Sequence, residues 1–435
     1  MNINDLILST KGKFIGTISL DDTYNKIKTN SLEIKPDDVF VALIGENTDG
    51  HKYIDSAIEN GAKILIVSKK DDYSIPYILV EDTTKALGDI AHYMVLKYNP
   101  NVIALTGSVG KTTTRNLLLK LLSNKYNVLA NEKNYNNHIG VPLTVFNLDE
   151  NVEILLVELG MNHLNEISYL SKMVNPNVAM ITNIGSSHIG LLGSKDNILK
   201  AKLEILDGMK EKILFVNGDD ELLKNIDGVI TSGFNIDNDL VGYDLKTNLY
   251  NSSFKIKSNG KEYEININIA SHLLPDVLLA INVALYYGVN IEDIIKTLKE
   301  YRAFDKRMDI LTDKHGNTII NDCYNSSFES LTGCLKLLEK ERQQKLLILG
   351  SIKELGEFSK EIHQSLKPYI EKINNKKVIL VGEEMENLKI EALYFKNYEE
   401  VLDYLKTQKI ENTLILIKGS NSVKLENITN YFINM

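Results

Sequence analysis

The sequence predicts an α/β protein of about three domains, and three observations lead to this prediction. The chain has 435 residues, which corresponds to three domains at roughly 150 residues each. Short apolar runs, typical of buried strands, alternate with longer stretches of helical periodicity. In one segment, residues 102–114, an apolar run passes through a glycine-rich turn into a helical stretch. This alternation is typical of βαβ units and mainly parallel sheets.

The first expected domain covers residues 1–98. Its predicted elements are strands at 39–44 and 63–68 around a helix at 52–60. Gly61 follows the helix, where a left-handed residue commonly ends one. The sequence Tyr98-Asn99-Pro100 marks the junction to the next domain, because the residue before a proline is restricted away from helical conformation.

The second expected domain covers residues 99–303 and begins with the strand before the glycine-rich turn. Further strands are predicted at 154–158, 178–182 and 212–216. The stretch 240–269 alternates apolar and polar residues in short runs, which indicates an antiparallel extension. Helices are predicted at 277–287 and 291–301.

The third expected domain covers residues 304–435. Its predicted strands lie at 318–321, 346–349, 378–381 and 414–417, with helical patterns between them. Because each connection contains a helical stretch, βαβ crossovers and a mainly parallel sheet are expected.

Composition narrows the class of protein. Hydrophobic residues make up 43% of the chain and the net charge is −9, so an extended nucleic-acid surface is not expected. Neither a membrane span nor a signal peptide is apparent. Cys323 and Cys334 show no metal-ligand spacing, which favours a reducing, cytoplasmic location. No exposed apolar helix face stands out, so a monomer is expected.

The glycine-rich turn is predicted to bind phosphate. Gly107 and Gly110 would let backbone N–H groups approach an anion, and the start of the following helix adds the positive end of its dipole. Lys111 can reach the terminal phosphates, and the Thr112 hydroxyl suits Mg²⁺. The common pattern has a glycine where this chain has Leu105, so the loop is a variant. A chance glycine turn is the alternative, but strand, turn, Lys-Thr pair and helix coincide here.

Polar residues also follow other predicted strands of the second domain. Glu158 ends a strand, where a Mg²⁺ ligand is expected near a phosphate loop, although a solvated strand end is the alternative. His188 lies beyond another strand and could contact metal or phosphate, or be structural. Lys202 lies in the helical stretch 194–204, and its pattern alone indicates a solvated lysine.

Four weaker signals lie elsewhere. Asn134, Asn136 and Asn137 precede the segment 140–144 in a polar loop that could reach substrate. In the third domain, Arg307 could form a fork to phosphate. The remaining signals are the strand-end sequences Asn321-Asp322-Cys323-Tyr324-Asn325 and Lys418-Gly-Ser420. Cys323 lacks a supporting His-Asp arrangement, so packing is favoured over a nucleophilic role.

Together these motifs resemble those of the Mur ligase family over nearly the whole chain and in the same order. Thr106-Gly-Ser-Val-Gly-Lys-Thr-Thr-Thr114 is similar to the family's TGSxGKTTT loop, which explains Leu105. The other similar segments are Asn134–Thr144, Glu158–Met161, Thr182–Gly185 with His188, Ala201–Glu204, Asp322–Asn325, Leu349–Glu357 and Lys418–Ser420. Segments Asp37–Gly45 and Asp49–His51 fit the family's UDP-sugar-binding domain.

The resemblance implies a three-domain Mur ligase architecture, with an N-terminal UDP-sugar-binding domain, a central P-loop ATPase domain and a C-terminal Rossmann-like domain. It implies ATP-dependent amide formation through an acyl phosphate. The motifs are most similar to those of the branch that adds D-alanyl-D-alanine to UDP-N-acetylmuramoyl-tripeptide during synthesis of the peptidoglycan precursor.

The resemblance also implies roles for individual residues. Catalytic roles fall to Lys111, His188 and Lys202. Contacts to ATP are expected from Thr106, Gly107, Ser108, Val109, Gly110, Lys111, Thr112, Thr113, Asn183, Arg307 and Asp322. Contacts to the other substrates are expected from Ser31, Asn134, Asn137, Tyr324, Asn325 and Lys418. Two Mg²⁺ ions are expected, one on Thr112 and Glu158 and one on His188 and Lys202, with Lys202 carbamylated by CO₂.

Some positions depart from the family pattern. Leu32 stands where the family usually has an arginine for the uridine nucleotide, Asp276 where it has an asparagine, and Asn421 where it has an arginine. These departures leave open a divergent ligase that joins another amine to another carboxylate. A nucleotide-binding module without ligase activity is the third reading. The intact set of metal and phosphate residues argues against it, namely Lys111, Thr112, Glu158, His188 and Lys202.

Overall fold

The computed structural model describes residues 1–132, 134–302 and 308–434. Arg307, predicted to contact ATP, lies outside the described residues. The chain divides into two compact units. The first consists of Met1–Leu105, Tyr126–Ala179 and Leu203–Ile213, and the second of Thr106–Lys125, Met180–Lys202 and Leu214–Met435.

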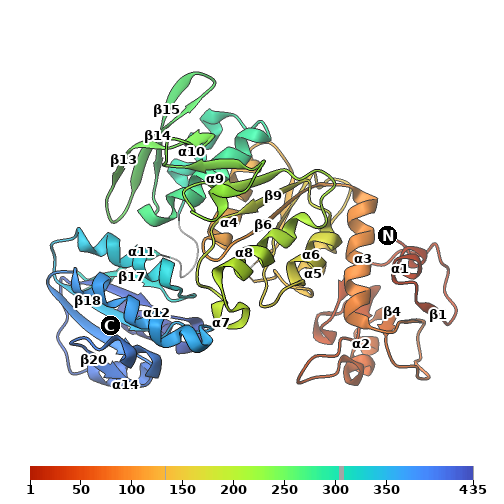
Figure 1. Cartoon of the computed structure of the whole chain (residues 1–435). Coiled ribbons are helices and arrows are strands. Elements are labelled where there is room, and N and C mark those ends of the chain that lie inside the picture. Colours follow the sequence, from red (N-terminus) through yellow and green to blue (C-terminus); the bar gives the residue numbers. More distant parts are fainter. Residues whose placement is uncertain (133, 303–307, 435) are drawn as a thin grey trace. The chain divides into compact units, whose positions relative to one another are not determined.

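The N-terminal part of the first unit is a five-stranded sheet with the order β1-β5-β4-β3-β2, in which only β1 runs antiparallel to its neighbour. Its elements are α1 (Ile3–Thr10), β1 (Lys13–Ile15), β2 (Ile27–Lys28), β3 (Asp38–Val41), α2 (Ile54–Glu59), β4 (Ala62–Val67), β5 (Tyr77–Leu79) and α3 (Thr83–Tyr98). Figure 1 shows the long helix α3 beside α1. Apolar side chains of α2 pack on one face of the sheet, around Phe40 and Leu65.

The rest of the first unit contains a second parallel ladder. Its elements are β6 (Asn101–Thr106), β7 (Val128–Ala130), α5 (Gly140–Val145), β8 (Ile154–Glu158), α6 (Glu166–Val174) and β9 (Val178–Ile181), of which β6 and β9 continue into the second unit. Strand β8 lies between β6 and β7 and is buried along its whole length. Because parallel strands place their carboxyl ends at one edge, β8 delivers Glu158 to the edge where β6 ends.

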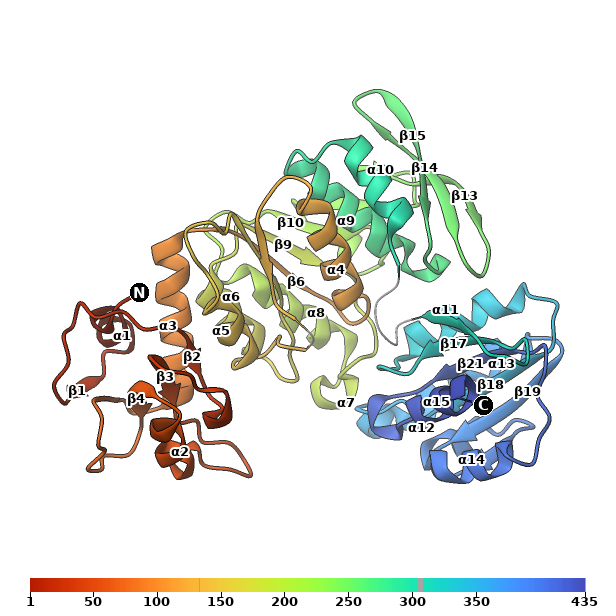
Figure 2. The same cartoon turned by 180° about the vertical axis from the view of Figure 1, so that it is seen from behind.

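The second unit begins with the helix after the glycine-rich turn. Its elements up to residue 300 are α4 (Lys111–Leu122), α7 (Ile189–Leu192), α8 (Lys195–Leu203), β10 (Leu214–Asn217), β11 (Ile230–Gly233), β12 (Leu240–Val241), β13 (Tyr243–Thr247), β14 (Ser252–Ser258), β15 (Lys261–Ile267), α9 (Leu274–Tyr286) and α10 (Ile291–Glu300). Strands β13, β14 and β15 form the expected antiparallel extension, which lies beside α10 (Figure 2).

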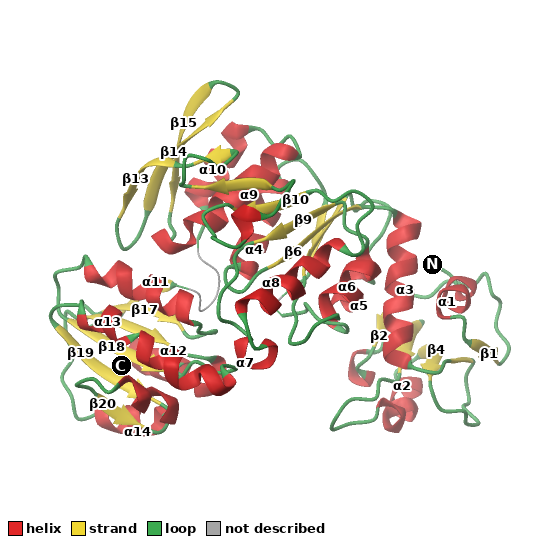
Figure 3. Cartoon of the chain, in the orientation of Figure 1, coloured by secondary structure: helices red, strands yellow, loops and turns green. Residues whose placement is uncertain are grey.

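The C-terminal part of the second unit is a six-stranded sheet with the order β16-β17-β21-β18-β19-β20. Its elements are β16 (Asp309–Thr312), β17 (Thr318–Asp322), α11 (Phe328–Glu339), β18 (Lys345–Gly350), α12 (Ser359–Ser365), α13 (Lys367–Glu371), β19 (Lys376–Val381), β20 (Leu393–Phe395), α14 (Tyr398–Leu405), β21 (Leu414–Lys418) and α15 (Glu426–Asn434). Helices α11 and α12 cover one face, and α14 and α15 the other (Figure 3 and Figure 2).

The strands expected from the sequence are present, with small shifts at their ends. Strand β8 has the predicted bounds, and α4 begins at Lys111, directly after the glycine-rich turn. Gly61 has the expected positive φ, at 98°. The sheet of the last domain is parallel apart from β16, an antiparallel edge strand that the alternation of elements did not indicate. Among the described residues, no helix combines the length and hydrophobicity that crossing a bilayer requires.

Candidate active site

The glycine-rich turn has a backbone that requires glycine at both predicted positions. Gly107 has φ 155° and Gly110 has φ 85°. A Cβ atom on Gly107 would lie 1.8 Å from Thr182 Oγ1, and one on Gly110 would lie 2.0 Å from Asp276 Oδ2. Neither position therefore accepts a larger residue without displacement of its neighbour. The turn passes directly into α4 at Lys111, as a phosphate-binding loop requires.

The segment after β9 holds this loop in place. Asn183 makes two side-chain hydrogen bonds to the loop: Val109 N donates to its Oδ1 (2.9 Å), and its Nδ2 donates to Val109 O (3.0 Å). Thr182 Oγ1 also donates to Val109 O, at 2.6 Å. Gly185 N donates to Ser108 Oγ at 2.8 Å. Asn183 thus stabilises the loop through Val109, while its predicted contact with ATP stays a prediction.

Two lysines of the second unit influence each other at this loop. Lys111 Nζ donates to the carbonyl of Gly107 at 2.7 Å. Lys202 is 1% exposed, in contrast to the solvated lysine that its helical pattern indicated. Burial and the charge of Lys111 lower the pKa of Lys202 well below its usual value. A larger share of neutral amine is therefore expected at Lys202 than at a surface lysine.

His188 lies next to a carboxylate from the last domain. Its Nδ1 is 2.9 Å from Glu354 Oε2, and the contact lowers the pKa of Glu354. Both residues have φ of 65°, in the left-handed region that non-glycine residues rarely adopt. The backbone of Glu354 is bound as well, because its carbonyl accepts from Gly190 N at 3.2 Å. Sequence reasoning did not single out Glu354, although the segment 349–357 contains it.

A second carboxylate from the last domain binds the same segment. Glu329, in the first turn of α11, accepts hydrogen bonds from the backbone N and the hydroxyl of Ser186, both at 2.9 Å. Lys195 Nζ lies 3.7 Å from Glu329 Oε1. The segment 184–190 therefore contacts the phosphate loop on one side and the last domain on the other. No sequence signal marked Glu329.

Glu158 belongs to the first unit and is buried at the end of β8. Its side chain is 2% exposed, and Asn136 Nδ2 donates to Oε1 at 2.9 Å. Asn131 fixes the backbone of Glu158 in both directions, accepting from its N at 2.9 Å and donating to its O at 3.0 Å. The polar loop thus orients the predicted metal ligand through Asn136. This role was not predicted.

The remaining predicted residues of the first unit lie in turns. Asn137 Oδ1 accepts from the backbone N of Ile139 and Gly140 at the start of α5, so its oxygen stabilises that helix end. Asn134 is exposed. Ser31 is buried, and its neighbour Leu32 is 81% exposed at the position where the family usually has an arginine.

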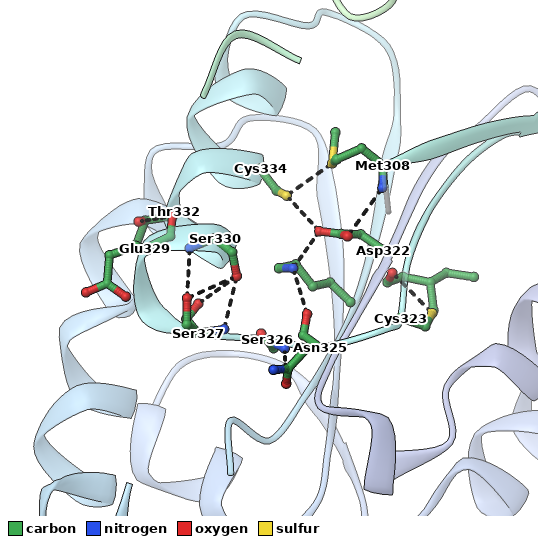
Figure 4. Close-up of polar contacts among 12 residues, drawn as sticks. Met308, Asp322, Cys323, Asn325, Ser326, Ser327, Glu329, Ser330, Thr332 and Cys334 are labelled. Atoms are coloured by element: carbon green, nitrogen blue, oxygen red, sulfur yellow. Dashed lines mark hydrogen bonds and ion pairs between the residues drawn. The ribbon is translucent and has the colours of Figure 1, made fainter. Parts of the chain in front are cut away.

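Asp322 and Lys418 form a buried ion pair in the last domain. They lie directly opposite each other on β17 and β21, with Lys418 Nζ 2.5 Å from Asp322 Oδ2. Figure 4 shows the surroundings of Asp322: Met308 N and the Cys334 thiol both donate to its carboxylate. Burial disfavours the charged amine, but Asp322 nevertheless raises the pKa of Lys418.

This pair limits what the two residues contact in this structure. Lys418 Nζ also donates to the carbonyl of Asn325 at 3.1 Å, and Lys418 is only 1% exposed. Its predicted contact with substrate therefore requires release from Asp322 and stays a prediction. Cys323 is buried in the core beside α15, as the packing interpretation expected, and burial raises its pKa to about 12.

A cavity of about 580 Å³ opens beside these residues, within the second unit. Ser186 and Ser187 line it from the segment after β9, and Tyr324 and Asn325 line it from the strand end of β17. The predicted substrate residues Tyr324 and Asn325 thus share a cavity with the segment that supports the phosphate loop. The cavity size is within the range of small-molecule sites.

Asp276 lies against the phosphate loop at the start of α9. It is 5% exposed, and burial raises the pKa of its carboxyl to about 8. A neutral carboxyl is therefore expected near pH 7, at a position where the family usually has the neutral amide of asparagine.

Comparison with known proteins shows the family to which this chain belongs. Three family models match in chain order: "Mur ligase family, catalytic domain" at residues 23–95, "Mur ligase middle domain" at 105–284 and "Mur ligase, glutamate ligase domain" at 306–421. The chain belongs to the Mur ligase family and has its three-domain architecture.

Within this family, the similarity extends to full-length relatives of one kind. The UDP-N-acetylmuramoyl-tripeptide–D-alanyl-D-alanine ligase of Bacillus subtilis (strain 168) is 33% identical over 423 residues, which cover 92% of each chain. The crystal structure of MurF from Acinetobacter baumannii has a TM-score of 0.92 at 27% identity and covers 100% of this chain and 99% of that one. MurF ligase from Thermotoga maritima in complex with ADP has a TM-score of 0.86 at 28% identity, with 94% and 97% covered.

Proposed function

We propose that this chain joins D-alanyl-D-alanine to UDP-N-acetylmuramoyl-tripeptide at the expense of ATP, in synthesis of the peptidoglycan precursor. The observation that carries the proposal is similarity over 92% of the chain to a relative named for this reaction, together with an intact phosphate loop. The γ-phosphate of ATP passes to the peptide carboxylate, and the acceptor amine then displaces phosphate from the acyl phosphate.

The phosphate loop and Lys111 bind the nucleotide. Backbone N–H groups at the start of α4 face an anion with the positive end of the helix dipole. Lys111 exchanges its bond to the Gly107 carbonyl for the terminal phosphates. Asn183 keeps the loop in shape, because its side-chain amide makes two hydrogen bonds to Val109. The ADP complex of the Thermotoga relative supports nucleotide binding by this chain.

The predicted metal ligands offer oxygen and nitrogen donors that fit Mg²⁺ in part. Among the residues that the structure describes, no three His, Cys, Asp or Glu side chains cluster to hold a metal by themselves. The proposed ligands are Thr112 and Glu158 for one ion, and His188 and carbamylated Lys202 for another. Carbamylation requires a neutral amine, which the lowered pKa of Lys202 favours. Bound Mg²⁺ would offset repulsion between the phosphates and the substrate carboxylate.

The remaining residues are proposed to position substrates. Ser31, Asn134 and Asn137 face the UDP-muramoyl-peptide, and Tyr324 and Asn325 face the acceptor in the cavity described above. Asp322, released from Lys418, would contact the nucleotide, as Arg307 would. The proposed domain limits are 1–98, 99–303 and 304–435. A monomeric, cytoplasmic enzyme without nucleic-acid or membrane partners is part of the proposal.

Phosphate release tests this function. The purified chain is assayed with ATP, Mg²⁺, UDP-N-acetylmuramoyl-tripeptide and D-alanyl-D-alanine, and then with each omitted. Release that requires both substrates, with a product whose mass equals the joined peptide, supports the proposal. No release with the complete mixture would overturn it, and release with ATP alone would indicate an ATPase.

A ligase for a different acceptor or carboxylate substrate is the second candidate, and Leu32 favours it. Its 81% exposed side chain offers an apolar surface where an arginine would attract a nucleotide phosphate. The same assay with other amino acids and dipeptides, or with other UDP-linked carboxylates, distinguishes the candidates. Turnover with one of these and not with the proposed pair would establish the second.

A further inference from the structure

Three charged side chains line the cavity beside the segment 184–190, two of them lysines and one a glutamate. Lys353 and Glu354 follow β18, and Lys424 follows β21. The acceptor dipeptide carries an amine that reacts and a carboxylate that does not. A site that selects this acceptor therefore needs a fixed cation for the carboxylate, because a carboxylate taken from water without a partner is costly.

Two of these three side chains already have partners. Lys353 Nζ pairs with Glu384, outside the lining of the cavity. Glu354 Oε2 lies 2.9 Å from His188 Nδ1. Lys424 makes no ion pair or side-chain hydrogen bond with any residue that the structure describes, and it is exposed. It is thus the cation of this wall that remains available to a ligand.

The backbone places Lys424 firmly even though its side chain is free. It has φ of 57°, in the left-handed region, at the end of the short 3-10 helix Asn421–Val423. Its N donates to Asn421 O at 3.0 Å, and its carbonyl accepts from the side chain of Asn427 at 3.1 Å. These two hydrogen bonds fix the backbone of Lys424, and so the position from which its side chain extends.

The same wall carries an unsatisfied hydroxyl. Ser326 is 6% exposed, and its Oγ has no hydrogen-bond partner among the described residues. A buried hydroxyl without a partner costs free energy, so a ligand oxygen that accepts from it would gain that amount on binding. A cation and a hydroxyl donor together fit a carboxylate.

We infer that Lys424 binds the free carboxylate of the acceptor, assisted by the Ser326 hydroxyl, and so restricts acceptors to those with an unblocked C-terminus. This inference rests on the proposed function for the identity of the acceptor. Lys424 takes the place in which sequence reasoning put Lys418, which Asp322 holds in the core. It also provides a cation near Asn421, where the family's usual arginine is missing.

The experiment compares D-alanyl-D-alanine with D-alanyl-D-alaninamide, whose C-terminus is neutral. Binding of each to the full chain in the presence of ADP and Mg²⁺ is measured by calorimetry, which requires no turnover. The wild-type chain should prefer the acid by about tenfold or more, as expected for a charge-assisted hydrogen bond. Lys424→Ala should lose this preference by weakening binding of the acid alone, and Lys424→Arg should retain most of it.

Two control variants keep the result interpretable. Lys353→Ala removes the other lysine of the cavity and should keep the preference, because that lysine is paired with Glu384. Ser326→Ala should reduce the preference to a smaller extent than Lys424→Ala. Affinity for ADP, measured for every variant, should equal that of the wild type and so reports intact folding.

Each outcome decides one question. An equal preference for the acid in wild type and Lys424→Ala overturns the inference, as does a wild-type chain that binds neither compound or both equally. Binding with the expected preference but without ligation in the phosphate assay counts against the proposed function and leaves the role of Lys424 supported.

Discussion

The carboxylate of Glu329 accepts hydrogen bonds from both the backbone N and the hydroxyl of Ser186, 143 residues away in the sequence. Asn183 and Gly185, three residues and one residue before Ser186, make hydrogen bonds to the phosphate loop. One short segment therefore carries both the support of the nucleotide loop and an anchor for the last domain. We therefore expect substitutions of Glu329 to weaken nucleotide binding.

Glu329→Ala should destabilise the protein and weaken nucleotide binding. Loss of two hydrogen bonds to a charged group should lower the free energy of unfolding by about 1–3 kcal/mol. Affinity for ADP should fall by roughly fivefold, within the range of coupling between linked sites. Glu329→Gln should be milder, because its amide oxygen still accepts from Ser186 N. Urea unfolding and ADP titration measure both effects.

The control for this change is Glu339→Ala, an exposed glutamate at the other end of α11. It should leave both quantities unchanged. If Glu329→Ala unfolds like the wild type and binds ADP equally well, the hydrogen bonds of Glu329 to Ser186 do not contribute to stability. The expected coupling of Glu329 to the nucleotide site through segment 184–190 would then be wrong.

Lys202→Ala should nearly abolish ligation. The proposed carbamate would be lost, and with it one ligand of the second metal ion. Added bicarbonate should not restore turnover, since no amine remains to react, whereas formate or acetate could supply the missing carboxylate and restore a part of it. Phosphate release in the complete assay measures turnover. Lys200→Ala, an exposed lysine on the same helix, is the matched control and should behave as the wild type.

Near-wild-type turnover of Lys202→Ala would remove the carbamate from the proposal. A carbamate carbonyl resonance in the carbon-13 NMR spectrum of the chain incubated with carbon-13 bicarbonate, absent from Lys202→Ala, would support the carbamate independently of activity.

Asp276→Asn should make the protein more stable at alkaline pH. Burial raises the pKa of Asp276 to about 8 in the folded chain, against about 3.9 when unfolded. The native state therefore binds the proton more tightly, and its stability falls as pH rises from about 4 to about 8. Asparagine does not titrate, so this loss should disappear.

Thermal unfolding at pH 5 and pH 8.5 tests this expectation. The difference in stability between Asp276→Asn and the wild type should grow with pH by an amount on the order of a few kcal/mol. Parallel pH profiles for the two proteins would show that Asp276 is ionised in the folded state, contrary to the effect of its burial.

The phosphate loop and the ends of the buried strands could be predicted from the sequence, because both are local features. Strand β8 has the predicted bounds since its apolar run ends at a charged residue. The partners of those strand ends could not be predicted. Lys418 follows the expected strand, yet its burial depends on the pairing of β21 with β17, which places Asp322 opposite it. Strand pairing between residues 96 positions apart leaves no local pattern.

The residues that sequence reasoning missed act through tertiary contacts. Glu329 lies in the first turn of a helix, where a glutamate is common for reasons of helix stability alone. Lys202 had the pattern of a solvated lysine and is buried, because α8 turns it inward. Only the family resemblance singled it out.

Asn136→Asp should impair the proposed metal site while leaving the fold intact. Asn136 Nδ2 donates to Glu158 Oε1 at 2.9 Å, so the substitution replaces a donor with a second carboxylate facing the first. Repulsion between the two carboxylates should displace Glu158. The Mg²⁺ concentration that gives half-maximal phosphate release should therefore rise by about tenfold. Asn430→Asp, at an exposed position of α15, makes the same chemical change elsewhere and should have no effect. An unchanged Mg²⁺ requirement in Asn136→Asp would mean that Glu158 does not serve as a metal ligand, since a ligand could not lose its orienting hydrogen bond without consequence.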